Sequence, residues 1–328
     1  LTEIIYNAKW AVDLSHDSGV FGNVGKSSGG FRVVIGNDVK KIPNNLFYSC
    51  GGLTSVTIGD SVASIGDNAF SYCTRLTEVI YNARAAENLT YQSEAFKNAG
   101  TYSGSFRVVI GDGVEKIPSY LFYGCTSLAS VKIGNSVASI GDRVFYGCTG
   151  LAGVTIGNSV ASIGSYAFVD CTSLTSVTIP DSVTSIGEDA FYHCTGLTSM
   201  TIGSGVTSIG DRVFSGCTGL TSVAIPDSVT SIGEFAFSGC SGIKEVYYNA
   251  KAAADLPNSY HAAFPGVGDS TSGVKVFIGE KVKKMPAYLF AGEHRIRTFK
   301  FAGDPPAAGT EALRSEYNTT IYAFYPMH

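Results

Sequence analysis

Apolar residues recur along this chain in a fixed order that restarts every 23 residues in most places. One copy is LTSVTIPDSVTSIGEDAFYHC (174–194), and LTSVAIPDSVTSIGEFAFSGC (220–240) is nearly identical to it. Short units begin at residues 30, 53, 105, 128, 151, 174, 197, 220 and 273, and units of 29 or 30 residues, here called long units, begin at 1, 76 and 243. Such repetition indicates one array, in which each unit buries its apolar edge against its neighbours.

The spacing of apolar residues predicts the structure of a single unit. Val177 and Ile179 alternate with polar residues, which is the pattern of a half-buried strand. Val183 and Ile186 predict a second short extended or turn-rich piece, and the residues just before Phe191 predict a single helical turn. Stacked units would then form a long parallel sheet with strands about 4.8 Å apart.

The unit at 174–194 resembles the repeat of the BspA-like bacterial leucine-rich repeat family, and the resemblance covers nearly the whole chain. IRTFKFAGDPP, followed by NTTIYAFYP, resembles the ends of such arrays. The resemblance implies an α/β leucine-rich-repeat solenoid, right-handed, with short strands, turns and single helical turns beside the long sheet. It also implies secretion or surface display, and adhesion or binding of host proteins. We expect the solenoid at 1–295 and a C-terminal partial repeat and cap at 296–328.

Eight cysteines stand at one position of the short units. They could form a disulfide framework, a metal site or a set of nucleophiles, or they could simply pack in the core. The long units carry Val24, Ala99 and Val267 at the equivalent place, so the position accepts a small apolar group. Stacked side chains keep their Cβ atoms farther apart than the roughly 3.8 Å of a disulfide, and one column does not surround a zinc ion. We favour buried free thiols at Cys50, Cys73, Cys125, Cys148, Cys171, Cys194, Cys217 and Cys240.

Composition and motifs argue against several classes of function. A net charge of -4 gives no general attraction to nucleic acid, and no apolar run is long enough to span a membrane. The five histidines share no repeat position, and no catalytic or phosphate-binding motif is present. We therefore expect no enzyme, no cofactor, no metal and no membrane insertion of this segment. We predict an acidic ridge at Asp67, Asp142, Glu188, Asp211 and Glu234. Calcium binding at this ridge is the disfavoured alternative.

The outward face of the predicted sheet is a Ser/Thr surface that changes only at the long units. There, an acid in the long unit meets a base in the next, which predicts cross-strand ion pairs. The pairs are Glu3–Arg32, Glu78–Arg107 and Glu245–Lys275. Two residues further on, the same strands carry apolar pairs, which either form exposed contact patches or are covered by the insertions. These pairs are Ile5–Val34, Ile80–Val109 and Tyr247–Phe277.

The insertions of the long units bring aromatic residues onto loops of a rigid scaffold, where binding anchors are common. The candidates are Trp10, Tyr91 and Tyr260. Ala-rich NARAAENL and NAKAAADL predict short helices at the solenoid edge, and the lysines at 40, 41, 116, 283 and 284 form a solvated edge or receive an acidic partner.

Together these features predict a non-enzymatic binding or adhesion module, secreted or on the cell surface, that recognises a host or matrix protein or a glycan. The six apolar strand-face residues and the three insertion aromatics are its candidate ligand contacts. We expect any targeting segment to lie outside this chain. The alternative is a structural spacer or stalk within a larger surface protein.

Overall fold

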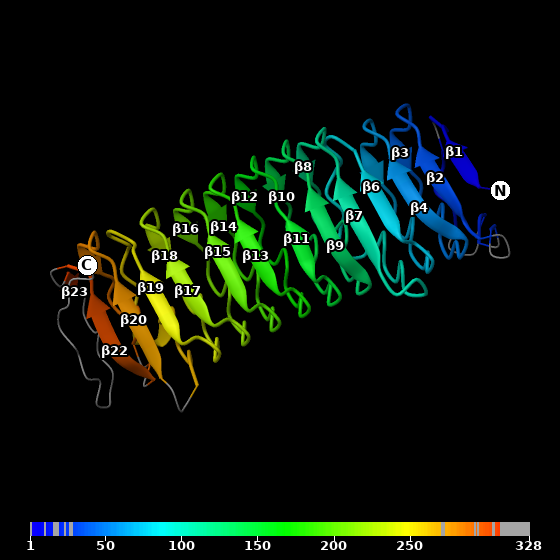
Figure 1. The fold of residues 1–328 in the computed structure, drawn as a ribbon. Coiled ribbons are helices and arrows are strands. Elements are labelled where there is room, and N and C mark those ends of the chain that lie inside the picture. Colours follow the sequence, from blue (N-terminus) through cyan, green and yellow to red (C-terminus); the bar gives the residue numbers. More distant parts are fainter. Residues whose placement is uncertain are drawn as a thin grey trace. The chain divides into compact units, whose positions relative to one another are not determined.

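The computed structural model describes residues 2–9, 11–15, 20–22, 24–25, 29–269, 273–291, 293, 295–303 and 306–308. The chain divides into two compact units, an N-terminal unit Leu1–Leu174 and a C-terminal unit Thr175–His328. In each unit the chain forms stacked coils, and successive coils place their strands side by side in parallel (Figure 1). The parallel-sheet solenoid predicted from the repeat is confirmed.

The N-terminal unit holds one longer-stranded sheet and, on another side of the coils, a series of two-residue strands. The longer strands are paired in the order β1 (Glu3–Tyr6), β2 (Phe31–Ile35), β4 (Leu53–Ile58), β6 (Glu78–Tyr81), β7 (Phe106–Ile110), β9 (Leu128–Ile133) and β11 (Gly153–Thr155). The short strands are β3 (Lys41–Ile42), β5 (Ser64–Ile65), β8 (Lys116–Ile117), β10 (Ser139–Ile140) and β12 (Ser162–Ile163).

The C-terminal unit repeats this arrangement. Its longer strands are β13 (Ser176–Ile179), β15 (Ser199–Ile202), β17 (Ser222–Ile225), β19 (Glu245–Tyr248), β20 (Val274–Ile278) and β22 (Ile296–Phe301). Its short strands are β14 (Ser185–Ile186), β16 (Ser208–Ile209), β18 (Ser231–Ile232), β21 (Lys284–Met285) and β23 (Ala307–Ala308). β22 pairs with β20, so the predicted partial repeat at 296 adds a strand, while residues 309–328 of the predicted cap lie outside the described residues.

Most coils contribute one core phenylalanine, whose ring packs against the equivalent ring of the next coil. In the N-terminal unit Phe47, Phe70 and Phe96 stack at ring-centroid distances of 5.4 and 4.9 Å. In the C-terminal unit Phe214 and Phe237 stack at 5.3 Å. These rings and the inward Val and Ile residues of the strands are buried, which accounts for the strict repetition of their positions in the sequence.

The predicted helical turn before each core phenylalanine is wrong. The segment alternates two kinds of bond: Asn45 N–H and Phe47 N–H donate to carbonyls of the next coil at 2.9 and 2.8 Å, while Tyr48 N–H donates back to the carbonyl of Asn45 at 3.1 Å. Asn45 has a φ of 58°, and Arg143 at the equivalent position has 53°. Because every second amide bonds to the neighbouring coil, a continuous helical ladder does not form. We call this side of the coils, positions 14 to 19 of each short unit counted from zero, the turn face.

The Ala-rich segments are not helices either. Ala83, Ala86 and Leu89 are buried, and the backbone N–H of Glu87 donates to Ala63 of the preceding coil at 2.8 Å. The small side chains therefore fill the core where short units use Val and Ile, and the backbone follows the extended path of the coil. Among the described residues the one helical element is the 3-10 turn η1 (Ser259–His261).

Candidate binding surface

The outward side of the longer strands, here called the strand face, is mostly polar where short units follow one another. Ser176 and Thr178 of β13, and Ser199 and Thr201 of β15, are exposed and lie in register. These four side chains present hydroxyls and no charged group. The positions at which the long units depart from this pattern therefore stand out chemically.

Two of the three predicted acid–base positions hold ion pairs between neighbouring strands. Arg32 Nε lies 2.9 Å from Glu3 Oε1, and Arg107 Nη2 lies 2.7 Å from Glu78 Oε1, each pair being directly in register. Both arginine side chains are about two-thirds exposed (63% and 66%), so solvent screens these attractions. The pairs fix the alignment of a long unit with its successor more than they stabilise it.

The third position differs from the prediction. Glu245 and Lys275 are in register, but no ion pair joins them within the described part of the chain. Instead, Glu245 Oε2 accepts a hydrogen bond of 2.7 Å from the hydroxyl of Tyr247. The reason is local: Tyr247 occupies the place of Ile5 and Ile80, and it brings a phenolic donor to the same side of the strand as the carboxylate.

The three apolar pairs lie on the strand face in the register predicted, and the insertions do not bury any of the six side chains. Ile5 is 63% exposed and Tyr247 is 37% exposed, while the other four are half-buried. Each long unit with its successor thus interrupts the hydroxyl surface with an apolar step beside charged or polar groups.

The most elaborate of these steps is in the C-terminal unit, and we call it the strand-face cluster: Glu245, Tyr247, Phe277 and Lys300. The rings of Tyr247 and Phe277 stack at 4.8 Å with an angle of 9° between their planes. The ammonium of Lys300 lies 5.5 Å from the Phe277 ring centroid, within reach of a cation–π attraction. The hydrogen bond to Glu245 raises the pKa of Tyr247. The cluster offers aromatic area, a cation, a carboxylate and a phenol within adjoining strands.

The insertion aromatics do not join this cluster. Trp10 lies outside the described residues. Tyr91 is 62% exposed and its ring lies 5.5 Å from that of Tyr123, on the turn face. Tyr260 is 83% exposed within η1, next to residues that bond to the turn face of the preceding coil. The sequence-predicted contacts therefore divide between two faces.

Two lysines of the predicted basic edge form ion pairs within the chain. Lys41 Nζ lies 2.7 Å from Asp13 Oδ2, and Lys284 Nζ lies 2.6 Å from Asp255 Oδ2. The second oxygen of Asp255 accepts the backbone N–H of Ala287 at 2.7 Å. The hydrogen bond from lysine, followed by the one from the backbone, lowers the pKa of both aspartates. Sequence reasoning missed these acids, although both stand at the same position of their long units.

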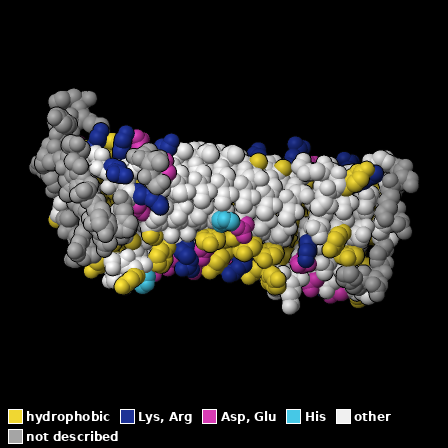
Figure 2. All heavy atoms as spheres, turned by 90° about the horizontal axis from the view of Figure 1, so that it is seen from below, with side chains coloured by type: hydrophobic (Ala, Val, Ile, Leu, Met, Phe, Trp, Pro, Cys, Tyr) yellow, Lys and Arg dark blue, Asp and Glu magenta, His cyan; other side chains and the backbone are white. Residues whose placement is uncertain are grey.

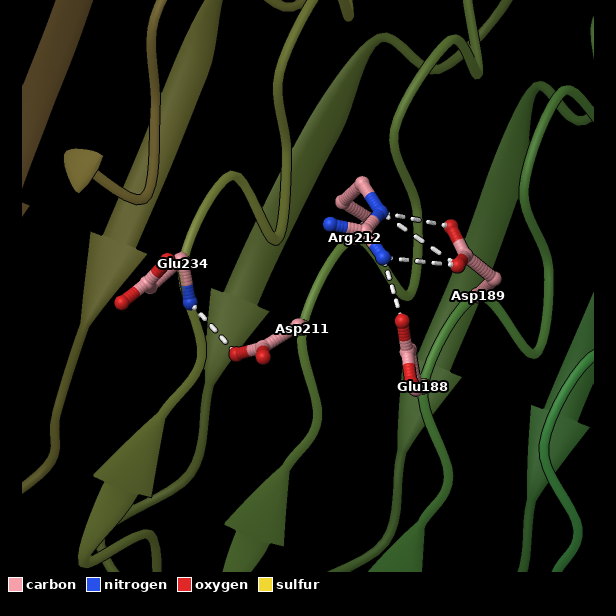
Figure 3. Close-up of polar contacts among 5 residues, drawn as sticks. All are labelled: Glu188, Asp189, Asp211, Arg212 and Glu234. Atoms are coloured by element: carbon pink, nitrogen blue, oxygen red, sulfur yellow. Dashed lines mark hydrogen bonds and ion pairs between the residues drawn. The ribbon is translucent and has the colours of Figure 1, made fainter. Parts of the chain in front are cut away.

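The predicted acidic ridge serves the stacking of coils. Asp142 Oδ1 accepts the backbone N–H of Ser165 at 2.8 Å, and Asp211 Oδ1 accepts that of Glu234 at 2.8 Å. Figure 3 shows the second of these contacts beside the ion pairs between Arg212 and the acids of the preceding coil. Among the described residues, no group of three or more His, Cys, Asp or Glu side chains is placed to hold a metal ion.

All eight cysteines are free and buried. Their thiols point to the backbone of the preceding coil: Cys73 Sγ lies 3.1 Å from the carbonyl oxygen of Phe47, and Cys148 Sγ lies 3.2 Å from that of Phe122. Burial raises the pKa of Cys73, and it raises the pKa of Cys240 to about 12. The thiols of Cys73 and Cys240 therefore stay protonated at neutral pH. The buried cysteines act as small apolar groups with a weak donor, a role that Val24, Ala99 and Val267 fill only in part.

Sequence reasoning also missed an accumulation of tyrosines on the turn face. Tyr123 and Tyr146 stack at 5.1 Å, and Tyr48 and Tyr72 meet edge to face at 5.6 Å. On the side of the molecule drawn in Figure 2, hydrophobic side chains gather along one edge with Lys and Arg among them, next to a broad band without either. The signal in the sequence was the recurrence of tyrosine at positions 15 and 18 of several short units.

Other structural signals are sparse. In the described part of the chain, no helix has the length and apolar character needed to cross a membrane. A search among curated proteins found no relative of this chain.

Three bacterial proteins of known structure are similar to this chain. A leucine-rich repeat protein of Eubacterium ventriosum is 23% identical, with a TM-score of 0.43 and coverage of 82% of this chain and 72% of that one. One of Bacteroides ovatus is 22% identical, with a TM-score of 0.37 and coverage of 82% and 83%. A leucine-rich cell surface protein of Faecalibacterium prausnitzii is 23% identical, with a TM-score of 0.35 and coverage of 93% and 84%.

The family comparison rests on the repeats themselves. The model of the BspA type leucine rich repeat region matches residues 31–107, 92–220, 161–297 and 209–321. Those matches span most of the chain. They include all of the short units apart from residue 30, the first residue of the first short unit. The chain belongs to the BspA type leucine-rich repeat family.

Proposed function

We propose that this chain is a non-enzymatic binding module of a secreted or cell-surface protein, and that it engages a protein or glycan ligand through the strand face. The observation that carries the proposal is the strand-face cluster around Tyr247 and Phe277. Stacked, partly exposed rings on a rigid sheet lose little conformational entropy when a ligand covers them. They also belong to the residue types that dominate binding energy at interfaces.

The chemistry of the cluster indicates how a ligand would be held. Phe277 and Tyr247 supply apolar contact area, while Lys300 and Glu245 supply one charge of each sign next to it. The apolar steps at Ile5–Val34 and Ile80–Val109 would provide secondary contacts of the same kind on the N-terminal unit. Membership of a family of bacterial repeat proteins supports surface display, which would bring the strand face to extracellular ligands.

The test is a binding screen of the chain on a glycan array and on immobilised extracellular-matrix and serum proteins. We expect at least one retained ligand, and we expect Tyr247→Ser to weaken it roughly tenfold, because a truncated aromatic anchor costs on the order of 1–2 kcal/mol. Thr201→Ser, on the same face within a short unit, is the matched control and should bind as the parent chain does.

A spacer or stalk gives different results in the same screen. It would retain no ligand, or it would retain one whose affinity is equal for the parent chain, Tyr247→Ser and Thr201→Ser. Either outcome would remove the basis of the proposal.

A further inference from the structure

The turn face of the N-terminal unit contains an arginine without an acidic partner among the described residues. The guanidinium carbon of Arg143 lies 4.2 Å from the centroid of the Tyr166 ring and 5.7 Å from that of Tyr120. Its Nη1 donates to the Tyr120 hydroxyl at 3.3 Å. Tyrosines on the preceding and following coils therefore hold the guanidinium between them, and the side chain is half-buried.

Contacts of this kind leave the edge of the guanidinium available. A cation–π contact uses the face of the group, whereas hydrogen bonds to a carboxylate are made in its plane. Of the three guanidinium nitrogens of Arg143, only Nη1 has a hydrogen-bond acceptor in the described part of the chain, and that acceptor is the phenol of Tyr120. Asp142, its neighbour in sequence, is occupied with the backbone N–H of Ser165.

The C-terminal unit shows what an arginine at this position does when acids are present. Arg212 occupies the same position of its repeat as Arg143. Its Nε lies 3.2 Å from Asp189 Oδ1, and its Nη2 is bonded to Glu188 (Figure 3). Both acids come from the turn face of the preceding coil, so this column of the solenoid holds carboxylates against a guanidinium.

In the N-terminal unit the two equivalent acids are missing. The residues of the preceding coil that correspond to Glu188 and Asp189 are Ser119 and Tyr120. Ser119 is short and buried, and its hydroxyl accepts the backbone N–H of Asp142 at 3.1 Å. No side chain of that coil therefore reaches Arg143 in the way that Glu188 reaches Arg212.

We propose that Arg143 and its flanking tyrosines form a second binding site, independent of the strand face, for an acidic peptide segment of a partner protein. A glutamate or aspartate of the partner takes the position that Glu188 has beside Arg212. The tyrosines contact the rest of the peptide through ring edges and hydroxyls.

A peptide fits this surface better than a sugar does. Sugars stack on open aromatic faces, but Tyr123 and Tyr146 stack on each other at an angle of 19°, and Arg143 covers one face of Tyr166. Tyrosine and arginine together are the residue types most enriched where proteins anchor one another. Tyr91, 62% exposed beside Tyr123, extends the contact surface.

The backbone geometry of the site is that of the repeat, because the residue at position 15 is left-handed in all nine short units. Tyr120, Arg143 and Tyr166 all have left-handed backbones, with φ of 62°, 53° and 59°. Bulky residues rarely adopt this conformation. The inter-coil hydrogen bonds of the turn face hold the backbone there, so the direction in which these side chains leave the backbone is set before a ligand arrives.

The test measures fluorescence anisotropy of a fluorescein-labelled hexaglutamate peptide with the whole chain, with hexaglutamine as the neutral probe. We expect saturable binding of hexaglutamate alone, and we expect Arg143→Gln to weaken it at least about tenfold, the loss typical of a charge-assisted hydrogen bond. Arg107→Gln removes the same charge from the strand face and should change binding less than twofold.

A second pair of variants tests the site by introducing an acidic side chain of this chain next to Arg143. Ser119→Glu places a carboxylate where Glu188 stands in the other unit, so it should occupy Arg143 and abolish peptide binding. Ser119→Gln has the same size without the charge and should keep binding. Absence of hexaglutamate binding to the parent chain would overturn the proposal. So would equal weakening by Arg143→Gln and Arg107→Gln, or undiminished binding by Ser119→Glu.

Discussion

Replacing a single cysteine tests whether the regular spacing of the thiols along the repeats reflects packing. In Cys148→Ala the Sγ atom is lost from a fully buried position, and with it the contact of 3.2 Å to the carbonyl oxygen of Phe122. That carbonyl also accepts the backbone N–H of Cys125 at 3.2 Å, so the substitution does not leave it without a donor. The penalty is therefore a packing loss with a small polar part.

The magnitude follows from three contributions to the free energy of unfolding. Burial of one heavy atom is worth about 0.8 kcal/mol. A residual cavity of about 20 Å³ adds about 0.5 kcal/mol at the measured cost per unit volume. The weak thiol hydrogen bond adds about 0.5 kcal/mol. We therefore expect Cys148→Ala to lower the free energy of unfolding by about 2 kcal/mol.

The assay is urea denaturation followed by circular dichroism, combined with thiol titration of the native protein at pH 8. Burial raises the pKa of Cys148, so the native thiol is protonated and shielded and should not react until urea unfolds the chain. A loss below about 0.5 kcal/mol for Cys148→Ala, or rapid labelling of the native thiols, would refute the packing account.

Two further predictions concern the ion pairs. Asp255→Asn should lower the melting temperature at pH 7. The bonds from Lys284 and Ala287 lower the pKa of Asp255 in the folded protein. Their stabilisation is therefore present above the unfolded pKa of about 3.9 and is lost as pH falls through the folded pKa. The two melting curves should therefore converge in a titration from pH 7 to pH 3, and a constant gap would contradict this. For Glu78 and Arg107, a double-mutant cycle should give a coupling of about 0.2–1 kcal/mol, reduced by 1 M salt. A coupling that salt leaves unchanged would argue against a screened surface pair.

The repetitive part of the fold could be predicted from the sequence because one apolar spacing is tested many times over. The inward positions of β13, the column of Phe191 and its equivalents, and the register of Glu3 with Arg32 all follow from aligning the units. A parallel stack brings equal positions together, so alignment of the sequence is alignment in space.

Local backbone choices were not predictable in the same way. The segment before Phe191 has a helix-like composition, but its amides bond alternately within the coil and to the next one, a choice that depends on the neighbouring coil. Likewise Ala83 and Ala86 favour helix intrinsically, yet the coil buries them as extended core residues. Tertiary contacts override the propensity in both places.

The candidate sites show the same division. The strand-face pairs lie where the register places them, but the hydrogen bond of Tyr247 to Glu245 depends on a phenol that alignment alone does not orient. Alignment places Tyr120, Arg143 and Tyr166 at one position of three successive units, but the cation–π contacts and the hydrogen bond depend on side-chain conformations that alignment alone does not orient.

Repeated residues build the scaffold, and we propose that the strand-face departures of the long units bind the ligand. A variant that returns those departures to the repeat pattern separates the two roles. The variant replaces six residues with threonine: Ile5, Val34, Ile80, Val109, Tyr247 and Phe277. We expect it to fold with an unchanged circular dichroism spectrum and to lose binding to the ligands that the parent chain retains in the screen. A folded variant that binds those ligands with the affinity of the parent chain would contradict the account.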